Sequence, residues 1–217
     1  MIQLTRKGIS GSADVERLRE SFLRTNTFRI SGLLHPDLIE FVQAHLEKTS
    51  WSTMIHTRIG AAEAAPDDPV IAGVLNFVMN TPAFLETVRC ATGCERIDSF
   101  FGRVYRLAGA DHYDQWHSDI STEERLVGIS INLGRIPYRG GVFRLREESS
   151  GNVLCELPNT VQGDAIFFRI SESLRHIVTP LEGTVPKTAF AGWFKAASPN
   201  YYAAIRDLPG ILASKPE

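Results

Sequence analysis

Three side chains that lie far apart in the sequence have the types and spacing of a metal site. His117 and Asp119 are separated by one residue, and His176 lies much later, in a strand-like run. Side chains on an extended strand alternate with period two, so His117 and Asp119 point to the same side. One imidazole and one carboxylate can then converge on one point. A His-x-Asp triplet is short enough to occur by chance, and His176 is what strengthens the hypothesis.

Two histidines and one carboxylate form the facial triad of mononuclear iron(II) sites, which leaves three neighbouring coordination positions open. A cosubstrate and dioxygen could occupy these positions. The remaining histidines fit the role of a ligand less well. His56 is one of these weaker candidates; His45 lies in a predicted helix and His35 beside a helix start, where surface or capping roles suit both. His112 lies in a loop that could approach a substrate. The three side chains named above are therefore the predicted metal ligands.

Lys187 is a candidate anchor for an anionic cosubstrate. The sequence has no lysine between Lys48 and Lys187, and Lys187 follows His176 by eleven residues, on the next predicted strand. A lysine near an iron site could bind one carboxylate of a dicarboxylic acid as a point charge. The alternative is an ordinary lysine exposed to solvent, in which case Arg175 or Arg169 would be the next candidate.

The composition is that of one ordinary globular domain. The chain has 217 residues, of which 43% are hydrophobic and 22% charged, and its formal net charge is −2. That length is enough for a sizeable core, and the charge gives no reason to expect nucleic acid or a membrane surface as a partner. The sequence contains no signal peptide pattern and no apolar run near the ~20 residues of a membrane span. Three cysteines without zinc-site spacing (Cys90, Cys94 and Cys155) indicate a reducing, cytoplasmic location.

The elements that must position the candidate residues fall into two parts. Residues 1–94 are predicted to form a mainly helical support, because apolar residues recur at helical spacing and Pro36 and Pro82 suit first helical turns. The segment 60–69 has no pattern and is expected to be a loop, either an active-site lid or a plain connector. The expected helices and strands of this part cover about 13–25, 28–30, 36–46, 51–59, 70–79 and 82–93.

Residues 95–197 are predicted to form a barrel of short strands separated by turns, and residues 198–217 a tail with one short helix. Seven or eight short strands with this punctuation are typical of a jelly roll. The fold class is therefore expected to be mainly β with flanking helices (α+β), a double-stranded β-helix with N-terminal helical support. The expected strands cover about 99–107, 126–133, 142–145, 153–157, 165–170, 176–178 and 188–195.

Ordered motifs in this second part resemble one family. A Gly163-Asp164 turn leads into an apolar strand, His176 begins the run HIVTPLEG, and Lys187 is followed by Gly192-Trp193-Phe194. This order is similar to the prolyl-4-hydroxylase-like branch of the Fe(II)/2-oxoglutarate-dependent dioxygenases. The resemblance covers about residues 101–195, and further matches are found at Gly109, Ile131-Asn132-Leu133 and Gly140-Gly141.

The resemblance implies a role for each matching residue. His117, Asp119 and His176 become iron ligands, and Lys187 becomes the partner of the distal carboxylate of 2-oxoglutarate. The basic residue lies one place later than is common and is Lys where many relatives have Arg. Leu107 also occupies a position where the family often has a cosubstrate-binding Tyr. Tyr105, on the same strand face, could replace that Tyr; Asn132 and Thr188 are further candidates for the cosubstrate pocket, or all three are ordinary strand residues.

The implied reaction uses Fe(II), 2-oxoglutarate and dioxygen. It would hydroxylate an unactivated C–H bond of an amino acid, a peptide side chain or a specialised metabolite, and convert 2-oxoglutarate to succinate. Related halogenases lack the carboxylate ligand, so the presence of Asp119 favours hydroxylation. Two alternatives stay open: a cupin-type dioxygenase or isomerase that needs no 2-oxoglutarate, and a non-catalytic binding domain on the same barrel.

The sequence leaves the substrate and the oligomeric state open. Arginines are frequent in the barrel region, and any of them could bind a substrate carboxylate. Most are expected to lie at solvated strand edges, where charge opposes edge-to-edge pairing. Trp116, beside the first ligand, could line the pocket or fill the core. The arginines are Arg103, Arg106, Arg135, Arg139, Arg144, Arg146, Arg169 and Arg175.

Overall fold

A seven-stranded antiparallel sheet forms the centre of the molecule. The computed structural model describes residues 2–56, 61–108, 115–121 and 124–196. The strand order in this major sheet is β3-β11-β7-β14-β6-β5-β4, so strands that are distant in sequence lie side by side. The bounds are β3 (Thr27–Ile30), β11 (Ala165–Arg169), β7 (Arg125–Asn132), β14 (Lys187–Ala196), β6 (Ile97–Leu107), β5 (Ala61–Pro66) and β4 (Trp51–His56).

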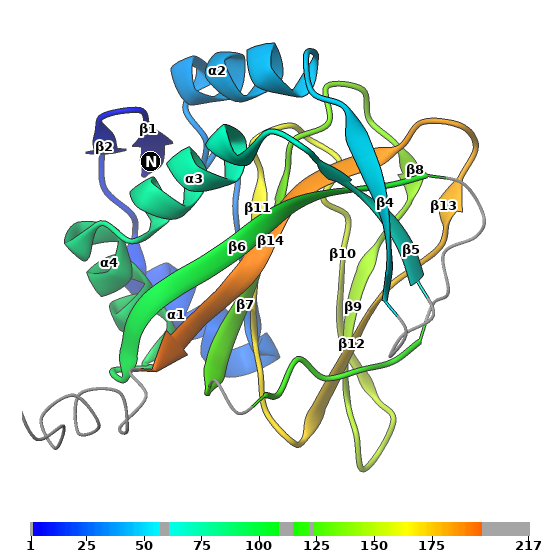
Figure 1. Cartoon of the computed structure of the whole chain (residues 1–217). Helices are drawn as coiled ribbons and strands as arrows, with labels where there is room; N and C mark the ends of the chain where they lie inside the picture. The colour runs from blue at the N-terminus through cyan, green and yellow to red at the C-terminus, as the bar shows by residue number, and fades with distance from the viewer. Residues whose placement is uncertain (1, 57–60, 109–114, 122–123, 197–217) are drawn as a thin grey trace, which may run out of the picture.

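A minor sheet of three antiparallel strands faces the major sheet (Figure 1). Its order is β10-β9-β12, with β10 at Val153–Leu157, β9 at Phe143–Glu147 and β12 at Leu174–Val178. Side chains of β9 and β12 pack against β11 of the major sheet in one apolar cluster. Two facing antiparallel sheets with these crossovers form a jelly roll, so the predicted fold class is confirmed. Two short pairs complete the described strands: β1 (Gln3–Thr5) with β2 (Gly8–Ser10), and β8 (Arg139–Gly140) with β13 (Leu181–Glu182).

Four helices lie close to their predicted positions. They are α1 (Val15–Thr25), α2 (Pro36–Leu46), α3 (Pro69–Met79) and α4 (Pro82–Thr92). Proline occupies the first turn of α2, α3 and α4, where its missing N–H needs no partner. The cap of α1 is Asp14, whose carboxylate accepts the Arg17 N–H, so this helix begins at Val15 and not at the expected residue 13.

The helices cover the outer face of the major sheet and bury its main core (Figure 1). Strand alternation separates this face from the inner one. On β14, Phe190 and Phe194 are fully buried against the helical side, while Lys187, Ala191 and Trp193 face the space between the sheets. Successive residues of one strand therefore serve two purposes, packing on one face and chemistry on the other.

The loop expected over 60–69 is instead largely a strand. β5 pairs with β4 over six positions, from Trp51 opposite Pro66 to His56 opposite Ala61, and it meets β6 where Ala64 lies opposite Arg106. Its sequence, AAEAAP, has poor strand formers and no alternation of apolar and polar residues. Backbone pairing with its neighbours therefore determines this strand, and that pairing leaves no local pattern in the sequence.

Some expectations lie outside the described residues. These are the tail after Pro199 with its short helix, the loop residues Gly109 and His112, and the end of the expected strand at Ile59. Among the described helices, none is by itself long and apolar enough to cross a membrane. The pair α3 and α4 meets that test of length and composition only jointly, across a bend of 65°.

Candidate metal centre

His117 and His176 lie directly opposite each other on neighbouring extended segments. His176 belongs to β12, and His117 meets it through an isolated antiparallel bridge where the sequence suggested a regular strand. The His117 N–H donates to the His176 carbonyl at 3.0 Å, and the His176 N–H donates to the His117 carbonyl at 2.9 Å. Residues that exchange both backbone bonds present their side chains on the same face. The pairing therefore brings both imidazoles to one side of the minor sheet.

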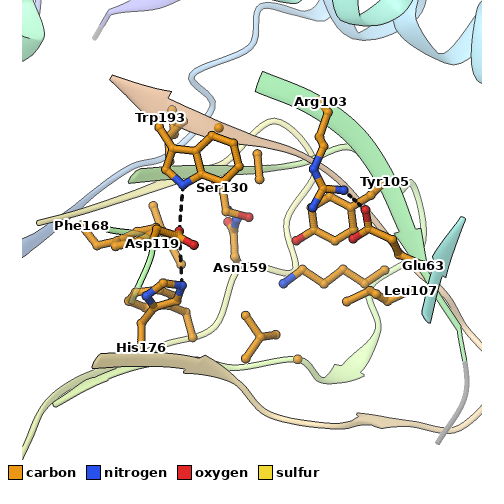
Figure 2. Close-up of a pocket in the computed structure, with 18 of the residues that line it drawn as sticks. Glu63, Arg103, Tyr105, Leu107, Asp119, Ser130, Asn159, Phe168, His176 and Trp193 are labelled. Atoms are coloured by element: carbon orange, nitrogen blue, oxygen red, sulfur yellow. Dashed lines mark hydrogen bonds and ion pairs between the residues drawn. The ribbon is translucent and has the colours of Figure 1, made fainter. Parts of the chain in front are cut away.

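Asp119 completes a group of three potential ligands. One donor atom from each of Asp119 and the two histidines lies within 4.8 Å of the others. Asp119 Oδ2 is 3.6 Å from His176 Nε2, and Figure 2 shows these two side chains facing each other at one end of a cavity. Neighbouring ligands of a metal with bonds of roughly 2.1 Å would be about 3 Å apart, so a small contraction would fit one ion. The structure thus brings together the three residues that the sequence singled out as ligands.

Hydrogen bonds orient two of these side chains. His117 Nδ1 lies 2.8 Å from the Gln115 carbonyl oxygen, to which only an N–H can donate. This bond places the proton on Nδ1 and leaves the lone pair of Nε2 for a metal. Trp193 Nε1 donates to Asp119 Oδ2 at 2.8 Å and holds the carboxylate beside His176. The sequence could not name these partners, because both contacts depend on the folded arrangement.

His176 lies in a largely apolar environment. Its ring centroid is 4.6 Å from that of Phe168 and 5.7 Å from that of Phe143. Burial lowers the pKa of His176 to about 4; the Asp119 carboxylate acts in the opposite direction and His117 lowers the pKa further. His176 is therefore neutral at pH 7, and the neutral imidazole is the form that binds metal ions.

The three ligands open into a cavity of about 170 Å³ between the two sheets. Its walls include Phe143 and Phe168, which pack against His176, and the apolar side chains of Ile166 and Leu107. Apolar walls limit the access of water and strengthen the electrostatic interactions of the few charged groups inside.

Lys187 is a buried cation that lines this cavity. It is 2% exposed, and its ammonium group lies 5.9 Å from the centroid of the Tyr138 ring. Within the described part of the chain, no carboxylate forms an ion pair with Lys187, and burial lowers its pKa to about 8. The ammonium is still mostly protonated at pH 7, and a buried charge without a counter-ion is costly. This environment fits a site for one carboxylate of a small anionic ligand.

The other predicted cosubstrate residues differ in position. Tyr105 lines the cavity, whereas Asn132 and Thr188 do not. Asn132 Oδ1 accepts the Gly134 N–H at 3.0 Å. The Thr188 hydroxyl accepts a hydrogen bond from Arg106 Nε at 3.2 Å, because alternation along β14 turns Thr188 away from the face that carries Lys187. Tyr105 therefore has more structural support as a cosubstrate contact than Asn132 or Thr188.

The alternative basic anchors and Trp116 lie elsewhere. Arg169 donates to Asn26 Oδ1, and Arg175 pairs with Glu148; neither lines the cavity. The guanidinium of Arg146 lies 4.4 Å from the ring centroid of Trp116, which is also outside the cavity lining. Residues that line the cavity and that sequence reasoning gave no role in it are Glu63, Gln115, Ser130, Asn159 and Trp193. Period-two alternation on β7 and β14 could have indicated Ser130 and Trp193; Glu63 and Asn159 have no such signal.

Comparison with known proteins identifies the fold. The sequence matches no protein-family model and no curated protein. The structure is similar to that of a prolyl-4-hydroxylase from Pseudomonas putida, with a TM-score of 0.63 and 17% identity over 85% of this chain and 100% of that one. It is also similar to a prolyl hydroxylase from Trichoplax adhaerens, solved with a peptide fragment of hypoxia inducible factor, with a TM-score of 0.62 and 14% identity over 84% and 89% of the two chains.

A third similar structure has a different activity. It is SnoN, an alpha-ketoglutarate-dependent non-haem epimerase from nogalamycin biosynthesis, with a TM-score of 0.60 and 14% identity over 94% of this chain and 92% of that one. All three similarities extend over most of both chains. The chain therefore has the double-stranded β-helix fold of the 2-oxoglutarate- and Fe(II)-dependent oxygenases, in the form found in prolyl-4-hydroxylases.

Proposed function

We propose that this protein is an Fe(II)/2-oxoglutarate-dependent oxygenase that hydroxylates a C–H bond of a small molecule or a peptide side chain. The observation that carries the proposal is the convergence of His117, Asp119 and His176 at one end of a cavity that also contains Lys187. The two histidines and the carboxylate supply the ligand set of a non-haem iron site. The buried ammonium of Lys187, which pairs with no carboxylate among the residues that the structure describes, supplies the charge that the second carboxylate of 2-oxoglutarate needs.

The residues present fit both groups. His117, Asp119 and His176 would hold the iron, and Lys187 would bind the distal carboxylate of 2-oxoglutarate. When bound, these groups would supply oxidation of a C–H bond by dioxygen, coupled to the conversion of 2-oxoglutarate to succinate. Tyr105 also lines the cavity, and burial raises the pKa of its phenol, so the hydroxyl stays protonated and can donate to an anionic cosubstrate.

The surrounding side chains would hold the site in position and keep it dry. Trp193 fixes the Asp119 carboxylate through its indole N–H, and the Gln115 carbonyl fixes the tautomer of His117. Phe143 on β9 and Phe168 on β11 pack against His176 from the two sheets and limit the access of water to it. These contacts keep the ligands oriented without requiring any movement during the reaction.

Hydroxylation is the outcome that we favour. Proteins with this fold include hydroxylases and an epimerase, so the fold alone does not choose the reaction. Halogenation would require a halide to bind the metal in place of a carboxylate ligand, and here Asp119 supplies that ligand. A product heavier than its substrate by one oxygen atom, measured by mass spectrometry, is expected, whereas a product of unchanged mass would indicate isomerisation.

The test is formation of succinate by the purified protein. Reaction mixtures would contain Fe(II), 2-oxoglutarate and dioxygen, and matched mixtures would omit each in turn. We expect succinate only when all three are present, together with a visible charge-transfer band when Fe(II) and 2-oxoglutarate are added without oxygen. Oxygen uptake that does not depend on 2-oxoglutarate would support a cupin-type enzyme instead. Absence of both iron binding and succinate would contradict the proposal and favour a binding domain.

A further inference from the structure

Two oppositely charged side chains, Glu63 on β5 and Arg103 on β6, line the same cavity. They form an ion pair on its wall, away from the metal ligands (Figure 2). Glu63 is buried, and the guanidinium of Arg103 lies 5.5 Å from the ring centroid of Tyr105. Pairing between neighbouring strands therefore holds both charges at the cavity, and the Tyr105 ring also packs against Arg103.

A second polar group in the cavity requires a hydrogen-bond donor. Asn159 is 2% exposed, and its Nδ2 donates to the Ser130 carbonyl at 3.0 Å. Its Oδ1 has no hydrogen-bond partner within the described ranges of the chain. 2-Oxoglutarate with both carboxylates ionised has only acceptors, so it cannot satisfy this oxygen. A donor from a further ligand, such as an ammonium or a hydroxyl group, can do so.

The charges in the loaded cavity would balance without a substrate. Iron(II) and Lys187 contribute three positive charges, and Asp119 and the two carboxylates of 2-oxoglutarate contribute three negative charges. Glu63 and Arg103 add one charge of each sign to the cavity wall. A substrate with a net charge would leave that charge uncompensated in a low-dielectric space, whereas a substrate with one charge of each sign would not.

We propose that Glu63 and Arg103 bind the head group of a zwitterionic, amino-acid-like substrate, with Arg103 taking the carboxylate and Glu63 the ammonium. This inference rests on the proposed function. A guanidinium binds a carboxylate in a bidentate manner, and an ammonium has three donors, enough for Glu63 and for an acceptor such as Asn159 Oδ1. The Glu63–Arg103 pair is exchanged for two new pairs of the same kind, so no buried charge loses its partner.

The proposal distinguishes free amino acids from residues within a peptide. An internal residue has neutral amides in place of the ammonium and the carboxylate. Both Glu63 and Arg103 would then have to stay paired with each other, and neither would contribute to recognition. A purely structural pair that joins β5 to β6 is the competing explanation, and it predicts no preference between a free amino acid and its blocked derivatives.

The experiment compares free L-amino acids with their N-acetyl and carboxamide derivatives as stimulators of succinate formation. For the preferred amino acid, either block is expected to lower kcat/KM by about 10- to 100-fold, the range for a lost charge-assisted hydrogen bond. In Glu63→Gln the preference for a free amino group should disappear, and in Arg103→Gln the preference for a free carboxylate should disappear. Loss of structure alone would lower all rates in proportion and leave both preferences unchanged.

Arg135→Gln provides a matched control. Arg135 pairs with Glu47 on the surface, outside the cavity lining, and this variant should keep both the rate and the preferences of the parent protein. Equal stimulation by free and blocked amino acids would overturn the inference, as would preferences that survive in both cavity variants. Substrate-independent succinate formation without stimulation by any free amino acid would also overturn it, while leaving the proposed function intact. Absence of iron binding and of succinate under all conditions would instead reject the proposed function itself.

Discussion

The two ends of the cavity are built in different ways. At the metal end, His117 and His176 are joined by two backbone hydrogen bonds, and Asp119 follows after one residue. At the other end, Glu63 on β5 and Arg103 on β6 form an ion pair, and the guanidinium of Arg103 also lies over the ring of Tyr105 on the same strand. Backbone pairing fixes the first end whatever ligand is bound, whereas side-chain pairs at the second end can be exchanged. Under the two proposals above, the residues for the reaction and the residues for substrate choice form separate sets, and each set could change without the other.

Substitution of a metal-binding residue should have the largest effect on activity and show that all three residues at the metal end are needed. His176→Ala is expected to abolish iron binding and to reduce succinate formation to background, because two remaining ligands do not hold the ion in an open site. Metal content after purification and a succinate assay would measure this. His45→Ala is the control and should retain activity, because His45 is a half-buried residue of α2 that pairs with Asp68 outside the cavity lining. Near-normal succinate formation by His176→Ala would contradict the assignment.

Lys187→Met should separate cosubstrate binding from stability. Methionine keeps an unbranched apolar side chain of similar length but removes the charge. Truncation of one partner of a buried charge pair costs about 2–5 kcal/mol, so the Kd for 2-oxoglutarate should rise by roughly 30-fold or more. The ligand-free protein should become more stable, because the variant removes a buried cation that has no counter-ion among the described residues. Titration of the charge-transfer band and thermal denaturation would measure the two effects; unchanged 2-oxoglutarate binding would place the anchor elsewhere.

Trp193→Phe should lower the affinity for Fe(II) without abolishing iron binding. The ring is retained, but the N–H that binds Asp119 Oδ2 is lost. Loss of a group that orients a metal ligand typically lowers metal affinity by about 10- to 100-fold. Competition with a chelator would measure the Fe(II) affinity, and circular dichroism would check the fold. An affinity equal to that of the parent protein would show that the indole only packs against its neighbours.

The pH dependence of 2-oxoglutarate binding should show the smallest effect. Burial lowers the pKa of Lys187 from 10.5 to about 8, so the ammonium is present below that pH and is lost above it. Affinity for 2-oxoglutarate should be constant below pH 8 and fall by up to about tenfold per pH unit above it. In Lys187→Arg the affinity should stay constant over this range, because guanidinium does not deprotonate. An identical decline in both proteins would assign the titration to another group.

The lowered pKa of Lys187 also predicts the direction in which protein stability changes with pH. Its folded-state pKa lies below the ordinary value, so the unfolded chain binds the proton more tightly than the folded protein does. The free energy of unfolding of the ligand-free protein should therefore rise between about pH 8 and pH 10.5. Denaturant titrations across this range would measure the rise, and Lys187→Met should not show this contribution.

The difference between the two ends also explains what the sequence could predict. Helical spacing and strand alternation are local, so they located the four helices and most barrel strands, and they put His117 and Asp119 on one side. β5 was missed because Ala and Pro have no strand pattern, and the Glu63–Arg103 pair was missed with it. The Trp193 contact with Asp119 depends on how β14 lies across the cavity, and no local motif encodes that.

Positions within the cosubstrate pocket were only partly predictable. Lys187 is the only lysine in a long stretch of the sequence, and the structure places it in the cavity wall. Asn132 and Thr188 belong to strands that line the cavity, but Asn132 binds a turn at the end of β7 and Thr188 points to the opposite face. Strand membership was thus predictable from local sequence, whereas the register that decides which side chains enter the cavity required the pairing of distant strands.

The paired backbone bonds between His117 and His176 have a consequence for how the protein handles its ion. Main-chain contacts do not involve the imidazole nitrogens, so they persist whether or not those nitrogens are occupied. Iron would therefore bind to a preorganised site, and binding would require little further ordering of the chain. Removal of the ion by a chelator and its later rebinding should then be fully reversible, because the backbone hydrogen bonds keep the two histidines in place.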